Sequence, residues 1–224
     1  MQVYDCRTRA DAQQTGIAHA TDALRAGKLV VFPTDTVYAI GADAFDPQAV
    51  AALLAAKRRG ADKPASVLVA DLATAEALVE SLPPDGRRLT EAFWPGALSL
   101  ILPATPSLAW NLGNTAGTVM VRMPDHPLAL ALLRGAGPIA QSSANLTGHP
   151  PATHLSEASA QLGDTVHTYL DGGPSGNAPS TIVDFTAGGT GGTDGTGGAP
   201  AVVRTGVIPR TAIEEVLGRS VPAA

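Results

Sequence analysis

The sequence has few of the residues that mark disulfide, metal-cluster and nucleic-acid-binding proteins. Cys6 is the only cysteine, which excludes an intramolecular disulfide and a thiolate metal cluster. Charged residues make up 16% of the 224 residues, and the formal net charge is -5. A nonspecific nucleic-acid-binding protein usually carries a basic excess, so this class is disfavoured. A local basic pocket is still compatible with that charge.

Long apolar runs are also missing. No uninterrupted apolar stretch approaches the roughly 20 residues needed to cross a bilayer, so we expect no membrane partner. Residues 1–11 contain an early Asp5 and no apolar run, which predicts that no signal peptide is present. Together with the single cysteine, these features predict a soluble, cytoplasmic protein.

The remaining composition is that of a globular protein long enough to bury a full core. Strand-like and helix-like segments alternate, but several expected strands follow one another directly. This pattern predicts an α/β fold with a mixed β-sheet. Strands are expected at residues 29–32, 66–69, 98–102, 118–122, 138–141, 165–170, 181–185 and 201–204, and helices at 17–26, 47–56, 74–80, 126–134 and 212–217.

Residues 187–199 consist only of Gly, Thr, Ala and Asp. Such a segment buries too little apolar area to offset its ordering entropy, so we expect a flexible Gly/Thr-rich surface loop. A phosphate-binding glycine loop normally leads into a helix N-terminus, whereas this one leads into an expected strand. A phosphate role for the loop is therefore disfavoured.

Polar side chains follow the expected strand at 29–32, in the segment Pro33-Thr34-Asp35-Thr36-Val37-Tyr38. Ligands of open α/β sheets bind where strands end, which gives a functional interpretation. A turn in which Asp and Thr satisfy local backbone donors is the structural alternative.

Three cations, Lys57, Arg58 and Arg59, end the expected helix at 47–56, and Lys63 follows shortly after. Cations at a helix C-terminus complement the helix dipole, which is a structural explanation. A triphosphate clamp is the functional one, because Lys supplies a point charge and Arg a bidentate fork.

Arg122 closes an expected strand before Met123-Pro124. A guanidinium among apolar residues is costly to desolvate unless it is paired, so a carboxylate partner is expected. That partner is either an internal aspartate such as Asp125 or the carboxylate of a substrate.

Hydroxyl groups recur at other strand ends. Ser142-Ser143-Ala144-Asn145 is compatible with a helix-capping turn or with a nucleophilic serine, but no histidine is arranged to activate a serine. Ser180 precedes one expected strand, and Arg204 ends the next. Acidic and histidine residues show no metal-ligand spacing, so no metal site on the protein is expected.

Taken in order, these motifs resemble the YrdC/Sua5 family, the L-threonylcarbamoyladenylate synthases, over residues 27–206. The resemblance implies a single YrdC-like domain, spanning residues 1–224, with a twisted mixed sheet and a concave ligand-binding face. Differences are local: Ala39 and Gly60 stand where the family has glycine and proline. The resemblance assigns Thr34, Arg122 and Ser180 to L-threonine, and Lys57, Arg59, Thr118, Ser143, Asn145 and Arg204 to ATP.

The implied activity is that of a nucleotidyltransferase. It forms threonylcarbamoyl-AMP and pyrophosphate from L-threonine, bicarbonate and ATP, with Mg²⁺ carried on the nucleotide and no catalytic side chain required. A transferase partner protein would then modify adenosine 37 of tRNA (t6A), so tRNA itself would be contacted indirectly or weakly. Two alternatives are a relative that handles carbamoyl-adenylate and a noncatalytic double-stranded RNA-binding module.

Overall fold

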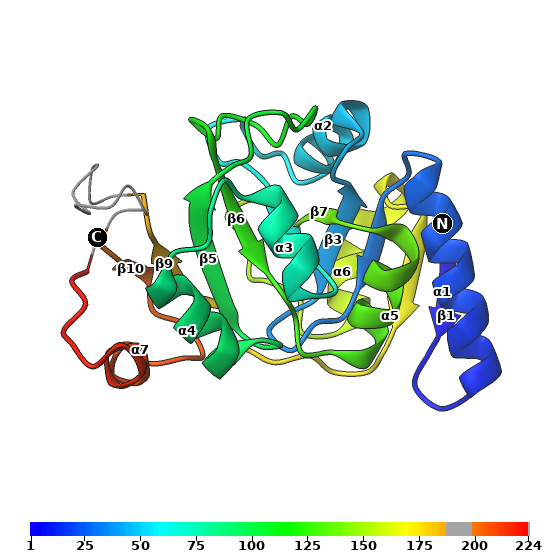
Figure 1. Cartoon of the computed structure of the whole chain (residues 1–224). Coiled ribbons are helices and arrows are strands. Elements are labelled where there is room, and N and C mark those ends of the chain that lie inside the picture. Colours follow the sequence, from blue (N-terminus) through cyan, green and yellow to red (C-terminus); the bar gives the residue numbers. More distant parts are fainter. Residues whose placement is uncertain (187–198, 224) are drawn as a thin grey trace.

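The computed structural model describes residues 1–186 and 199–223 (Figure 1). The loop expected at 187–199 therefore lies outside the described residues, except for Ala199. The strands are β1 (Gln2–Asp5), β2 (Val30–Phe32), β3 (Ala39–Asp43), β4 (Ser66–Leu68), β5 (Leu98–Pro103), β6 (Thr118–Arg122), β7 (Ile139–Ser143), β8 (Thr168–Asp171), β9 (Thr181–Asp184) and β10 (Ala201–Arg204). The helices are α1 (Ala10–Arg25), α2 (Pro47–Ala56), α3 (Leu72–Leu78), α4 (Pro84–Phe93), α5 (Pro127–Ala136), α6 (Leu155–Leu162) and α7 (Arg210–Leu217), with a 3-10 turn at Gly163–Thr165.

All ten strands form one sheet in the order β1-β8-β2-β3-β7-β4-β6-β5-β9-β10. Strand β8 is parallel to β1 and β2, β4 to β6, and β5 to β9. The other neighbouring pairs are antiparallel. The predicted α/β fold with a mixed sheet is therefore confirmed.

Each strand and helix expected from the sequence is present, with shifts at some ends, but four elements were missed. Strand β3 has the sequence Ala-Ile-Gly-Ala-Asp, in which Ile40 is the one β-branched residue and no residue is aromatic, whereas Gly, Ala and Asp are depleted in strands. Helix α4 begins Pro-Asp-Gly, a combination that is typical of turns. Strand β1 and helix α6 were also missed. The strand expected from residue 165 begins at Thr168, because Thr165 belongs to the 3-10 turn and two further residues separate this turn from the strand.

Strands β2, β3 and β8 carry helices on both faces. Val30 and Phe32 of β2 pack in a cluster with α1 and α5, whereas Val31, between them, packs in a cluster with α2 and α6. Because side chains alternate along a strand, the two pairs of helices cover opposite faces. These three strands are therefore buried on both faces.

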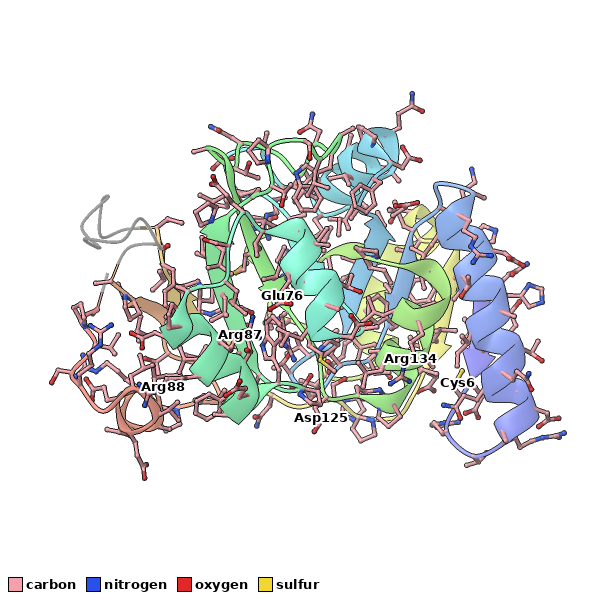
Figure 2. The ribbon with its side chains drawn as sticks, in the orientation of Figure 1. Cys6, Glu76, Arg87, Arg88, Asp125 and Arg134 are labelled. Atoms are coloured by element: carbon pink, nitrogen blue, oxygen red, sulfur yellow. The ribbon has the colours of Figure 1, made fainter. Side chains whose placement is uncertain are left out.

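Strands β4, β6 and β5 are covered differently. Val67, Val121 and Leu100 pack with α3, α4 and α7 in the largest core cluster. Figure 1 shows α3 and α4 in front of β5 and β6, and Figure 2 shows Glu76 of α3 beside Arg87 of α4, with which it forms an ion pair. The opposite face of these strands carries polar side chains and borders a cavity. None of the helices in residues 1–186 and 199–223 is both long and apolar enough to span a membrane.

Candidate functional site

A cavity of about 290 Å³ lies over the polar face of the central strands. Its floor comes from alternate residues of neighbouring strands. On β6, Met120 and Arg122 line the cavity, whereas Val119 and Val121 belong to the core. The lining residues are Thr34, Thr36, Val37, Arg59, Pro64, Ser66, Ser99, Met120, Arg122, Gln141, Ser142, Ser143, Pro151, Pro179, Ser180 and Arg204.

The charge of this lining is one-sided. Within the described part of the chain, it contains three arginines, Arg59, Arg122 and Arg204, and no aspartate or glutamate. Among the described residues, a salt bridge links Asp35 to Arg122, and no carboxylate lies within 4.0 Å of the other two guanidinium groups. The cavity therefore favours an anionic ligand, although the chain as a whole is acidic.

Arg122 is 5% exposed, and its guanidinium is held by three groups. Nε donates to the carbonyl of Gly96 at 2.9 Å, Nη1 donates to Oγ1 of Thr36 at 2.8 Å, and Nη2 donates to Oδ1 of Asp35. A guanidinium has five N–H donors, so two of them are left to contact a ligand in the cavity. Burial lowers the pKa of Arg122, while the adjacent Asp35 acts to raise it.

The internal partner of Arg122 is Asp35, so an internal aspartate is present, but it is not Asp125, the example named from the sequence. Asp125 lies in the loop between β6 and α5 (Figure 2) and contributes its backbone N–H, which donates to Oδ1 of Asp35 at 3.1 Å. A residue that follows a strand can bond to a distant loop through its side chain or through its backbone. The sequence does not show which of the two groups forms the contact.

The loop after β2 is fixed by hydroxyl groups. Oγ1 of Thr34 donates to the carbonyl of Val37 at 2.7 Å and lies 3.0 Å from Oγ1 of Thr36. Gly176 closes over this loop, since a Cβ at that position would lie 2.6 Å from the carbonyl oxygen of Asp35. Thr34 therefore combines both interpretations of the segment: it stabilises a turn and it lines the cavity.

Arg59 reaches the cavity after a sharp reversal at the end of α2. Arg58 adopts the left-handed conformation (φ 52°), while the backbone N–H groups of Arg58 and Arg59 donate to the carbonyls of Ala55 and Leu54. This is the Schellman arrangement, which usually places glycine at the left-handed position. Nη1 of Arg59 donates to Oγ of Ser142 at 2.9 Å.

Lys57 is 2% exposed and does not line the cavity. Its Nζ donates to the carbonyl of Ser143, to the carbonyl of Asn145 at 2.6 Å and to Oδ1 of Asn145 at 3.4 Å. An ammonium group has three donors, so all are engaged by the segment behind Ser143. Burial, followed by the positive charge of Arg59, lowers the pKa of Lys57 to about 8.

Ser180 and Arg204 meet at the other end of the cavity. Nη2 of Arg204 donates to the carbonyl of Ser180 at 2.8 Å and to its hydroxyl at 3.1 Å. Val202 pairs with Val183, and Arg204 pairs with Ile182, so Val203 is an extra residue in β10. This β-bulge re-aims the side chain of Arg204, as bulges near binding sites often do.

The structure thus brings together six of the nine residues assigned by resemblance. Thr34, Arg59, Arg122, Ser143, Ser180 and Arg204 line the cavity. Lys57, Asn145 and Thr118 do not: the first two lie behind Ser143, and Thr118 donates its hydroxyl to the carbonyl of Thr115 at 2.8 Å. Their roles in ATP binding stay predictions.

The structure also bears on other interpretations of the sequence. The segment 142–145 does not cap a helix, because β7 extends to Ser143 and α6 begins only at Leu155. No serine hydroxyl bonds to a histidine within the described residues, so a Ser–His pair is not assembled there. Within the same ranges, no group of three His, Cys, Asp or Glu side chains is placed to hold a metal ion.

The sequence analysis missed one lining residue of β5, Ser99, because this serine lies inside an apolar strand pattern.

Comparison with known proteins gives consistent matches. The Sua5/YciO/YrdC family model, described as "Telomere recombination", matches residues 22–192. A Mycobacterium tuberculosis protein provisionally named threonylcarbamoyl-AMP synthase is 54% identical over 97% of this chain and 95% of its own length. A Bacillus subtilis threonylcarbamoyl-AMP synthase is 41% identical over 90% of this chain and 56% of its own.

Among solved structures, Pyrococcus abyssi Sua5 complexed with L-threonine superposes with a TM-score of 0.89 and 33% identity. The match covers 99% of this chain and 62% of the Pyrococcus chain. The present chain therefore spans nearly all of its mycobacterial relative but less than two thirds of that archaeal protein.

Proposed function

Since the chain belongs to the Sua5/YciO/YrdC family, we propose that its cavity is the active site of a threonylcarbamoyl-AMP synthase, a nucleotidyltransferase. The observation that carries this proposal is the cavity lining, in which three arginines and several hydroxyl groups meet without an acidic residue from residues 1–186 or 199–223. Such a lining suits a polyanionic nucleotide together with a small polar amino acid.

The reaction joins three substrates. The amine of L-threonine attacks the carbon of bicarbonate, forming an N–C bond, and water leaves; a protonated amine releases one further proton to solvent. An oxygen of the resulting carbamate then attacks the α-phosphorus of ATP. A new P–O bond forms, the bond between the α- and β-phosphates breaks, and pyrophosphate leaves.

Threonine binding is assigned to Thr34, Arg122 and Ser180. The two uncommitted N–H groups of Arg122 suit a carboxylate, which accepts two parallel hydrogen bonds from a guanidinium. Asp35 helps to fix the plane of this fork, because its carboxylate accepts a hydrogen bond from Nη2. Thr34 and Ser180, both buried, provide hydroxyl groups to the same cavity.

Nucleotide binding is assigned to Arg59, Arg204 and Ser143, with Lys57, Asn145 and Thr118 as supporting residues. Lys57 would act on the phosphates through Ser143, whose carbonyl it holds, unless its ammonium group is released on ATP binding. Magnesium enters as part of the substrate, bound to phosphate oxygens and water, as is usual for this hard ion with nucleotides.

Catalysis by this site requires no protein nucleophile. Holding three substrates in contact lowers the entropic part of the barrier, and arginines stabilise the charge that develops on the transferred phosphoryl group. Roles outside the cavity follow from the product: a partner transferase would carry the threonylcarbamoyl group to adenosine 37 of tRNA in the cytoplasm, so direct tRNA contact would be weak or absent.

Pyrophosphate release tests this function. It should require ATP, bicarbonate and L-threonine together, because the carbamate forms before adenylation. Release without threonine, or with carbamoyl phosphate in its place, would favour the carbamoyl-adenylate alternative. No release under any condition, with tight binding of double-stranded RNA that weakens steeply with salt, would favour the RNA-binding alternative.

A further inference from the structure

Four polar side chains form a row across adjacent strands of the cavity floor. Arg122 lies on β6, Ser99 on β5, Ser180 directly before β9 and Arg204 on β10. Leu100 pairs with Val121, which places Ser99 beside Arg122, and all four residues line the cavity. The row therefore consists of two guanidinium groups with two hydroxyls between them.

The hydroxyls of Ser99 and Ser180 lie 2.9 Å apart, and both residues are buried. Ser180 also accepts a hydrogen bond from Nη2 of Arg204. Two hydroxyls carry two protons, and one of these serves the contact between them. The other proton has no acceptor among the described residues, so it is left to donate into the cavity.

Donors on Arg204 are also left over. Its recorded hydrogen bonds use Nε and Nη2, whereas Nη1 has no acceptor among the described residues. Within residues 1–186 and 199–223, no carboxylate forms a salt bridge with Arg204. The pair of serines with Arg204 thus presents a hydroxyl and a guanidinium edge, a combination that suits a small planar oxyanion.

We propose that Ser99, together with Ser180 and Arg204, binds bicarbonate and then the carboxyl group of the carbamate formed from it. This inference rests on the proposed function. In the proposed active site, Ser180 contacts threonine and Arg204 contacts the nucleotide phosphate. The two ligands therefore meet where these two residues touch. The carbon that joins the threonine nitrogen to the α-phosphate must lie at that meeting point. Ser99 is the remaining hydroxyl there.

This arrangement has a chemical consequence. The hydroxyl holds one oxygen of bicarbonate while the amine attacks, and it keeps the same oxygen away from the α-phosphorus. The Arg204 edge neutralises the negative charge that the carbamate keeps after water has left. The free carbamate oxygen is then the one directed toward the nucleotide.

Ser99→Ala tests the proposal, because it removes the hydroxyl and leaves Ser180 bonded to Arg204. A hydrogen bond to a charged group corresponds to about a tenfold to hundredfold change in affinity. The KM for bicarbonate should rise by about that factor at constant pH, and saturating bicarbonate should restore most of kcat. The affinity for threonine, measured by calorimetry without bicarbonate, should stay within about threefold.

Ser66→Ala is the matched control. Ser66 lines the same cavity from β4, is equally buried, and is engaged by the amide of Gln141 at 2.6 Å. Its KM for bicarbonate should stay within about twofold of the wild-type value. An unchanged bicarbonate KM in Ser99→Ala, an equal rise in both variants, or a loss that bicarbonate does not rescue would overturn the proposal. Inactive wild-type protein would instead reject the proposed function itself.

Discussion

The carboxylate of Asp35 pairs with the buried guanidinium of Arg122 across 87 positions of the sequence. The two groups fix one another, because Asp35 also accepts the backbone N–H of Asp125 and so ties the loop after β2 to the end of β6. The guanidinium therefore presents its remaining donors to the cavity in a defined plane.

Asp35→Asn should weaken threonine binding although Asp35 is not assigned a contact with threonine. The amide keeps the size of the side chain but removes the charge that orients Arg122. We expect the KM for threonine to rise about tenfold, the KM for ATP to change much less, and the free energy of unfolding to fall by about 1–3 kcal/mol. Steady-state kinetics and chemical denaturation measure both. A variant with wild-type threonine KM would show that Arg122 is held sufficiently by Thr36 and Gly96.

Arg122→Lys should lose threonine affinity while it retains a positive charge. An ammonium group cannot form the bidentate contact with a carboxylate, and bonding to Asp35, Thr36 and Gly96 would use all three of its donors and leave none for a ligand. Threonine affinity measured by calorimetry should fall by about tenfold or more. Equal affinity in the two proteins would place the threonine carboxylate elsewhere in the cavity.

Arg59→Ala should raise the KM for ATP by about tenfold or more, as expected for a lost contact with a charged phosphate. The adjacent Arg58 provides the control, because it is exposed and does not line the cavity. Arg58→Ala removes the same charge at the neighbouring position and should leave the KM for ATP within about twofold. Similar effects in both variants would mean that general electrostatic attraction, and no specific clamp, is responsible.

Lys57 should make stability depend on pH in an unusual direction. Its pKa is about 8 in the folded protein, below the ordinary value, so the folded state binds fewer protons than the unfolded state above pH 8. The cost of burying the charge is thus fully present below pH 8 and is relieved as pH rises toward the ordinary lysine value.

Comparison with Lys57→Met isolates this effect, because other titrating groups are common to both proteins. The unfolding free energy of the wild type, minus that of Lys57→Met, should increase by about 1–3 kcal/mol as the pH rises from 7.5 to 10. Denaturation curves at several pH values measure it. A difference that does not vary with pH would show that the hydrogen bonds to Ser143 and Asn145 fully compensate the burial.

Local signals explain which parts of the fold the sequence predicts well. Helix α2 begins at the expected residue because Asp46 caps it, with Oδ1 accepting the N–H groups of Gln48 and Ala49. Strands β5 and β6 were expected from dense apolar residues. By contrast, β3 has weak strand propensity and is held by its neighbours β2 and β7, so tertiary contacts decide its conformation.

The candidate site shows the same division. Arg122 was identified because a cation at the end of an apolar strand is unusual and costly, whereas Arg204 was assigned through the family resemblance. Ser99 gives no such signal, since one serine between leucines is compatible with either face of a sheet. Its significance depends on Ser180, 81 positions away, and that proximity is created by the pairing of β5 with β9. The partner of Arg122 was missed for the same reason.

The alternation that lines the cavity also affects how the sheet assembles. A slip of β6 by one residue would turn Arg122 into the apolar cluster beneath α3 and α4 and turn Val121 toward water. An unpaired guanidinium in that cluster would be strongly unfavourable, so the slipped pairing is excluded. The ligand-binding face thus enforces the correct strand pairing during folding. Replacing its polar residues by apolar ones would weaken ligand binding and would also make the slipped strand pairing less unfavourable.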